Sequence, residues 1–115
     1  MEALRLESLG AYFHTVTVDF PMGNGIFKSA SFDAQFARLE QEELEELSAK
    51  IVTGAIPDRE VVERVLVGWR GPLDAAGNPL PFSPENRDAV LKLYPTQPTI
   101  VREFVRSIEV AKEKN

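Results

Sequence analysis

His14 is the one histidine of the chain, and imidazole is the side chain best suited to proton transfer or metal binding near neutral pH. Either task requires partners: a nucleophile and an orienting group in catalysis, or further nitrogen and sulfur ligands around a metal. The sequence contains no cysteine and no second histidine. We therefore interpret His14 as a strand residue near the surface, without a catalytic or metal-binding role.

A dense group of carboxylates could in principle exchange protons or bind divalent cations. Its members surround the apolar residues Leu44 and Leu47, which favours a solvated helix face, and no calcium-loop motif is present. Gly23-Asn24-Gly25 lacks the following helix that a phosphate-binding glycine loop needs. The sequence therefore predicts no catalytic residue, no metal site and no cofactor, and we interpret the chain as a non-enzyme. The carboxylates are Glu40, Glu42, Glu43, Glu45 and Glu46.

Five residues are better candidates for contact with a partner protein: Trp69, Leu80, Phe82, Arg102 and Arg106. Tryptophan is enriched in binding hot spots, but Trp69 is also expected to anchor the loop that follows it, with Leu80 and Phe82 folded over its ring. Arg102 and Arg106 lie one helical turn apart and would suit the carboxylates of a partner. Glu103 and Glu109 interleave with them, which favours an ordinary salt-bridged surface over a partner-binding one.

The region that must position these residues begins with a β-hairpin. Residues 12–20 and 26–36 alternate between apolar and polar side chains, and the turn residues Pro21-Met22-Gly23-Asn24-Gly25 separate them. Leu4 and Leu6 would add a third strand before the hairpin. Because a two-stranded hairpin is unstable alone, its apolar face must pack on the rest of the chain. That face comprises Val16, Val18, Phe20, Ala30, Phe32, Ala34 and Phe36.

Four helices are predicted after the hairpin. The first covers 41–50 and ends before Gly54, the second runs from Asp58 through Trp69, the third is capped by Ser83 and runs to Tyr94, and the fourth begins at Pro98. Residues 70–82 contain three prolines and two glycines, so we expect an irregular loop there. This order predicts a single α+β domain over residues 1–115, with an antiparallel hairpin or small sheet packed on the helices.

Composition and charge narrow the class of partner. The 115 residues are 43% apolar and carry a net charge of −5. An acidic chain without a basic cluster is poorly suited to nucleic acid, whose affinity depends on phosphate contacts. No apolar run approaches the about 20 residues that cross a bilayer, and the charged N-terminal residues are atypical of a signal peptide. We therefore expect a cytoplasmic protein that binds other proteins and neither nucleic acid nor membrane.

A resemblance to a known family rests on three segments. They are Val67-Gly68-Trp69-Arg70-Gly71, the string from Gly77-Asn78-Pro79-Leu80-Pro81-Phe82 to Ser83-Pro84-Glu85-Asn86, and Phe32-Asp33-Ala34-Gln35-Phe36-Ala37-Arg38-Leu39 followed by Glu42-Glu43-Leu44. Together they resemble the tail assembly chaperones of long-tailed bacteriophages and prophages. The resemblance spans roughly residues 12–115.

This resemblance implies a non-catalytic protein of the bacterial host cytoplasm that keeps the helical tape measure protein soluble and assists tail tube assembly. It implies the tape measure protein as partner, with the tail tube protein as a second candidate, and absence from the mature virion. A client helix would fit a groove between amphipathic helices, whereas an exposed strand edge would accept a strand or another copy in a homo-oligomer. The alternative function is a structural tail completion or head–tail joining protein.

Overall fold

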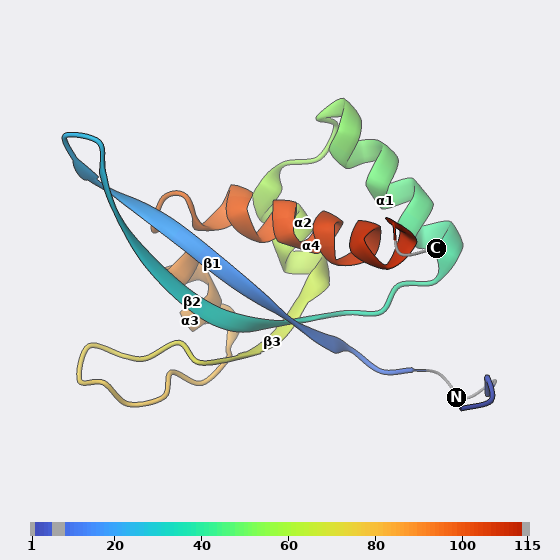
Figure 1. The fold of residues 1–115 in the computed structure, drawn as a ribbon, viewed down its shortest axis with the longest axis horizontal. Helices are drawn as coiled ribbons and strands as arrows, with labels where there is room; N and C mark the ends of the chain where they lie inside the picture. Colours follow the sequence, from blue (N-terminus) through green and yellow to red (C-terminus); the bar gives the residue numbers. More distant parts are fainter. Residues whose placement is uncertain (1, 6–8, 114–115) are drawn as a thin grey trace.

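The computed structural model of the chain describes residues 2–5 and 9–113 and confirms the α+β fold (Figure 1). The three strands form one antiparallel sheet of order β1-β2-β3. None of the helices in this part of the chain is long and apolar enough to span a membrane. The elements in chain order are β1 (Tyr12–Gly23), β2 (Ile26–Phe36), α1 (Gln41–Thr53), α2 (Asp58–Val65), β3 (Leu66–Arg70), α3 (Pro84–Leu91) and α4 (Thr96–Glu113).

β1 and β2 form the predicted hairpin with the predicted faces. Val16 and Ala34 are buried in the core, whereas Thr17 lies opposite Ser31 on the other face of the sheet. The turn has positive φ angles at Gly23, Asn24 and Gly25, a backbone conformation that glycine and asparagine adopt most readily. Residues 21–31 are exposed, and the hairpin extends past the helices as a projecting arm (Figure 1).

The second predicted helix is wrong in its last turn. α2 ends at Val65, and Leu66–Arg70 forms β3 instead of continuing the helix through Trp69. β3 pairs with the edge of β2 that β1 leaves free, so that Trp69 lies opposite Ala34. Valine, glycine and tryptophan are weak helix formers, and the free edge of β2 offers these residues backbone hydrogen bonds that a local pattern does not reveal.

The third strand of the sheet is therefore not the one predicted. Leu4 lies outside every strand and is exposed to solvent, and Leu6 lies outside the described residues. β3 takes the third position because Gly68 allows close approach to β2: a Cβ atom there would lie 2.3 Å from the side-chain oxygen Oε1 of Gln35. A glycine within a strand often marks such a close approach.

Most helix ends follow the signals in the sequence. Gly54 ends α1 in the left-handed conformation at φ 73°, and the Ser83 hydroxyl accepts a 3.1 Å hydrogen bond from the Asn86 backbone N–H at the start of α3. α3 ends at Leu91, three residues before the predicted end. α4 starts at Thr96, so Pro98 lies within its first turn, where a missing N–H costs no hydrogen bond.

α4 packs on β1, and α2 packs on both α4 and β3 (Figure 1). The Phe36 and Phe104 rings meet edge to face at the centre, with centroids 5.3 Å apart. Full burial of one large apolar side chain stabilises a fold by about 1.5–3 kcal/mol. The core consists of Val16, Val18, Ala34, Phe36, Leu47, Val61, Val62, Val65, Leu66, Leu91, Ile100, Val101 and Phe104.

The long loop before α3 is more ordered than its prolines and glycines predict. It folds back on itself through an isolated bridge between Leu73 and Pro79, and the Leu80 N–H donates to the Pro72 carbonyl at 2.8 Å. At its tip the Asp74 carboxylate accepts hydrogen bonds from two backbone N–H groups, those of residues 76 and 78. The remainder of the loop is irregular, as predicted.

Candidate functional site

Three of the five predicted partner-binding residues lie in one cluster. The Trp69 indole N–H donates to the Leu80 carbonyl at 2.8 Å, and its ring meets Phe82 edge to face with centroids 4.9 Å apart. The Phe32 ring also meets the indole edge to face, with centroids 6.3 Å apart. All of these side chains are half-buried. The cluster therefore explains Trp69 as the anchor of the loop, and its role toward a partner stays a prediction.

Arg102 and Arg106 lie elsewhere, on the outer face of α4. Each side chain is 67% exposed, and their guanidinium groups lie 3.9 and 3.6 Å from the Glu103 carboxylate. Ion pairs at this exposure contribute little to stability. The two guanidinium groups are therefore available to the carboxylates of a partner, and no contact among the described residues links them to the Trp69 cluster.

The two arginines border an open groove between α4 and the end of α1. Its floor is apolar and includes Ile51 from α1 with Val101 and Val105 from α4. The groove has a volume of about 620 Å³. We call it the arginine groove, and it is lined by Ile51, Asp58, Pro98, Val101, Arg102, Val105, Arg106 and Glu109.

A second groove lies between the first half of α1, the start of β1 and the later part of α4. Its walls are mainly apolar, with the Phe104 ring at the base and the Arg38 guanidinium 5.1 Å from the centre of the Tyr12 ring at its edge. Its volume is about 390 Å³. We call it the tyrosine groove, and it is lined by Tyr12, Ala37, Arg38, Leu39, Leu44, Phe104, Ser107 and Ile108.

Both grooves exist because α1 touches the rest of the fold over a short length. Leu47 is the α1 residue that is fully buried. Leu44 and Ile51, one turn to either side on the same stripe, are half-buried and each lines a different groove. An ion pair of 2.9 Å between Glu43 and Arg64 holds α1 to α2. The apolar stripes of α1 and α4 therefore leave apolar surface uncovered on both sides of the Leu47 contact.

His14 has a partner that the sequence did not indicate. Its Nε2 atom lies 3.0 Å from Oε1 of Glu103, a side chain that is only 13% exposed. The two residues are 89 positions apart, so no sequence pattern could indicate their contact. The neighbouring contact between Tyr12 and Ser107 is also a polar link from β1 to α4. Both contacts link β1 to α4, and Tyr12 and Ser107 also line the tyrosine groove.

The acidic cluster of the sequence behaves as a helix surface. Glu42, Glu45 and Glu46 are exposed. No group of three or more potential metal ligands occurs in residues 2–5 and 9–113.

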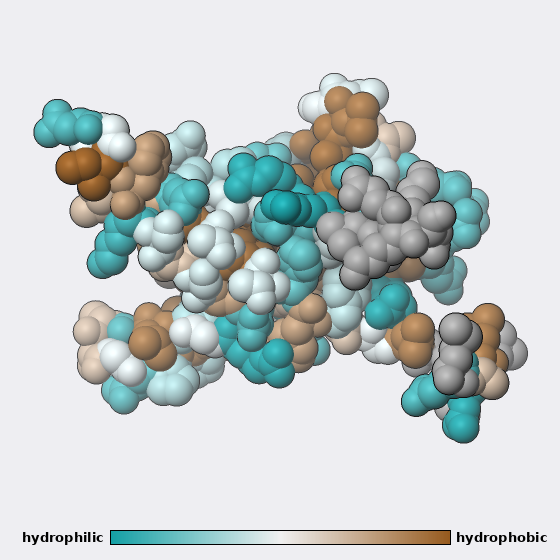
Figure 2. All heavy atoms as spheres, viewed as in Figure 1, coloured by the Kyte–Doolittle hydropathy of each residue, from teal (hydrophilic) through white to brown (hydrophobic). Residues whose placement is uncertain are grey.

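The face of the sheet opposite the helices is polar. The Thr15 hydroxyl donates to Asp33 at 2.9 Å, and the Thr17 and Ser31 hydroxyls lie 2.8 Å apart. Arg70 stacks 3.6 Å above the Phe13 ring. Such a ladder of cross-strand polar pairs is typical of a solvated face. The end of the hairpin arm carries more exposed apolar side chains, and Figure 2 shows hydrophobic atoms close to that end at the upper left.

Comparisons of this chain with protein-family models, with curated proteins and with solved structures find no match.

Proposed function

We propose that the chain is a non-catalytic assembly chaperone of the phage tail type, which binds the helical tape measure protein through the arginine groove. The observation that carries this proposal is the incomplete cover between the apolar stripes of α1 and α4. Ile51, Val101 and Val105 form an apolar floor that the fold leaves open. A client helix with its own apolar stripe would close it in the helix-in-groove mode.

The charges at the border favour a particular kind of helix. Arg102 and Arg106 stand on one side of the floor, and each exposes two thirds of its side chain. Asp58 and Glu109 also border the groove. A client helix with acidic residues beside its apolar stripe would pair with the two arginines and hold one register. Charge pairs at the border of an interface contribute mainly to specificity and association rate.

The shape of the site suits temporary binding. The floor residues Ile51 and Val105 are already half-buried in the free protein, so a client removes only part of their surface from water. Binding energy must also offset the lost freedom of two molecules, which limits the affinity of so small an apolar contact. A chaperone needs this property because the tail tube protein must later displace it from the tape measure protein.

The proposed role places the protein in the cytoplasm of the bacterial host and outside the mature virion. The tape measure protein is the main proposed partner, and the tail tube protein is a second one. The runner-up function, a structural tail completion or head–tail joining protein, makes the opposite prediction about the particle. Mass spectrometry of purified virions separates them, because a structural protein is retained in fixed copy number and a chaperone is lost.

Co-expression tests the binding function itself. The tape measure protein of the same phage or prophage is produced with the full chain or with an empty vector, and its soluble fraction is measured after centrifugation. We expect the chain to raise that fraction and to co-purify with the client. An unchanged soluble fraction, with the chain itself soluble and folded, would contradict the proposal.

A further inference from the structure

The end of the hairpin arm carries three apolar side chains that are largely exposed to solvent. Met22, Ile26 and Phe27 expose 62%, 63% and 60% of their surface. Ile26 lies opposite Gly23 and Phe27 opposite Pro21, so the group sits on both strands next to the turn. Successive strand residues point to opposite faces, so Ile26 and Phe27 expose apolar surface on both faces of the arm. Exposed apolar surface on a projecting element is a common mark of a protein contact. We call this group the hairpin tip.

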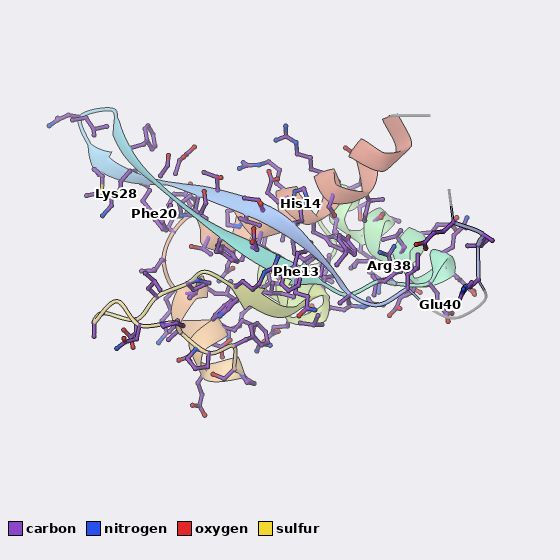
Figure 3. The ribbon with its side chains drawn as sticks, turned by 60° about the horizontal axis from the view of Figure 1, so that its bottom comes forward. Phe13, His14, Phe20, Lys28, Arg38 and Glu40 are labelled. Atoms are coloured by element: carbon purple, nitrogen blue, oxygen red, sulfur yellow. The ribbon has the colours of Figure 1, made fainter. Side chains whose placement is uncertain are left out.

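The tip lies at one end of the molecule and the tyrosine groove at the other. Figure 3 shows Lys28 near the end of the arm, and Arg38 and Glu40 at the opposite side of the fold. Tyr12, which lines the groove, and Met22 belong to the same strand. Ten residues of extended strand separate them, or about 33 Å. The tip therefore cannot reach the groove of its own chain.

The two surfaces fit in size, and each has an opposite charge close to it. The charged residue in the groove lining is Arg38, whose guanidinium already lies over the Tyr12 ring, so the charge that Lys28 can pair with is Glu40 just outside the lining. Lys28 is the only charged side chain of residues 20–28. Glu40 is exposed and directly follows Leu39, which lines the groove. The groove volume of about 390 Å³ is well above the roughly 150 Å³ that holds a benzene ring in a protein cavity. The Phe27 ring thus has room among Tyr12 and Leu44.

We propose that a second copy of the chain supplies the occupant: the hairpin tip of one copy inserts into the tyrosine groove of the next, with Lys28 facing Glu40. The contact joins two different surfaces, so each copy in a row keeps one free tip and one free groove. Such head-to-tail contacts build rings when the rotation closes and open filaments when it does not. The arginine groove remains free for a client, and the self-association does not depend on the proposed client.

The test uses two variants of the full chain that each remove one surface. Phe27→Ser alters the tip, with Leu73→Ser as its control because Leu73 is equally exposed on another loop. Leu44→Lys alters the groove, with Val52→Lys as its control on the same helix. Circular dichroism and thermal melting check that each variant folds, and Leu39→Lys replaces Leu44→Lys if that variant does not.

Sedimentation velocity across a wide concentration range gives the readout. We expect the mass of the wild type and of both control variants to rise beyond a dimer with concentration. Phe27→Ser and Leu44→Lys should each associate at least roughly tenfold more weakly. Mixed in equal amounts, they should form a dimer that grows no further, because one intact tip still meets one intact groove. Lys28→Glu should weaken association, and Glu40→Lys added to it should restore it.

A wild type that stays monomeric at all concentrations would overturn the proposal, as would a mixture of the two variants that forms no dimer. Association through paired tips would also contradict it: Leu44→Lys alone would then associate as strongly as the wild type, because every copy of that variant keeps an intact tip. Client solubility measured with Phe27→Ser keeps this test apart from the proposed function. We expect that variant to hold the client as the wild type does.

Discussion

The imidazole Nε2 of His14 lies 3.0 Å from the Glu103 carboxylate, and the Tyr12 hydroxyl lies 2.9 Å from the hydroxyl of Ser107. A step of two residues along β1 thus matches a step of four residues along α4. The lengths agree, since two strand residues rise about 6.6 Å and four helix residues about 6 Å. This register sets α4 on β1 and thereby positions the residues of both grooves.

We expect the contact between His14 and Glu103 to contribute modestly to stability. A double-mutant cycle with His14→Ala and Glu103→Ala should give a coupling free energy of about 0.5–1.5 kcal/mol in urea unfolding, because the pair is partly buried. His14 also packs on Phe36, so the single variant His14→Ala should cost more than the coupling alone. Purely additive effects of the two substitutions would show that the pair does not hold the register.

Trp69 should stabilise the fold through its ring and its N–H group separately. Trp69→Phe removes the hydrogen bond to the Leu80 carbonyl and should cost about 1 kcal/mol. Trp69→Ala also removes the contacts with Phe32 and Phe82 and should cost about 2–4 kcal/mol in chemical unfolding. Tyr94→Ala serves as control because Tyr94 is exposed. If Trp69→Ala keeps full stability but loses a partner, the residue belongs to an interface instead.

The end of α1 should be sensitive to the residue type at Gly54. Its φ of 73° lies in the left-handed region, where a Cβ atom is unfavourable. Gly54→Ala should lower the free energy of unfolding by about 1 kcal/mol, and Gly54→Asn by less, because asparagine tolerates this conformation. Gly10→Ala, in a loop without positive φ and without close neighbours, should change it by less than about 0.5 kcal/mol. Equal effects at the two glycines would contradict this.

Arg102 and Arg106 should act on the client and hardly on the fold. The double variant Arg102→Glu/Arg106→Glu should lower the melting temperature by at most about a few degrees, because both side chains are exposed although each lies near the Glu103 carboxylate. It should weaken client binding about tenfold at low salt, and the loss should shrink as salt rises. The matched charge reversal Lys50→Glu/Lys92→Glu lies outside the arginine groove. If both double variants lose client binding to the same extent, the cause is general charge repulsion and not the arginine groove.

Features encoded by neighbouring residues could be predicted from the sequence. The hairpin followed from alternation and the Gly-Asn-Gly turn, and the caps at Gly54 and Ser83 followed from local chemistry. The end of α2 could not be predicted in this way. Residues 66–70 satisfy a helical apolar pattern, and their strand state depends on a free edge of β2 at least 30 positions earlier in the chain.

The candidate site depended even more on the tertiary arrangement. Arg102 and Arg106 were chosen from their one-turn spacing, but the floor beneath them combines Ile51 of α1 with Val105 of α4. The apolar periodicity of α1 and α4 places both floor residues on the inner faces of these helices, so the sequence predicts ordinary core residues there. The structure shows that the core is incomplete there. α1 is anchored by the buried Leu47, and apolar surface beside that contact stays open. The partner of His14 was hidden for the same reason.

The central claim is that the arginine groove binds a helical client, and adjacent residues of α1 provide its most direct test. Ile51 lines the groove, whereas Val52 is 86% exposed on another face of the helix. The dissociation constant of a purified tape measure segment is measured for the wild type, Ile51→Asp and Val52→Asp, each confirmed as folded. We predict binding at least roughly tenfold weaker for Ile51→Asp and unchanged for Val52→Asp. Equal affinity for all three proteins would contradict the claim.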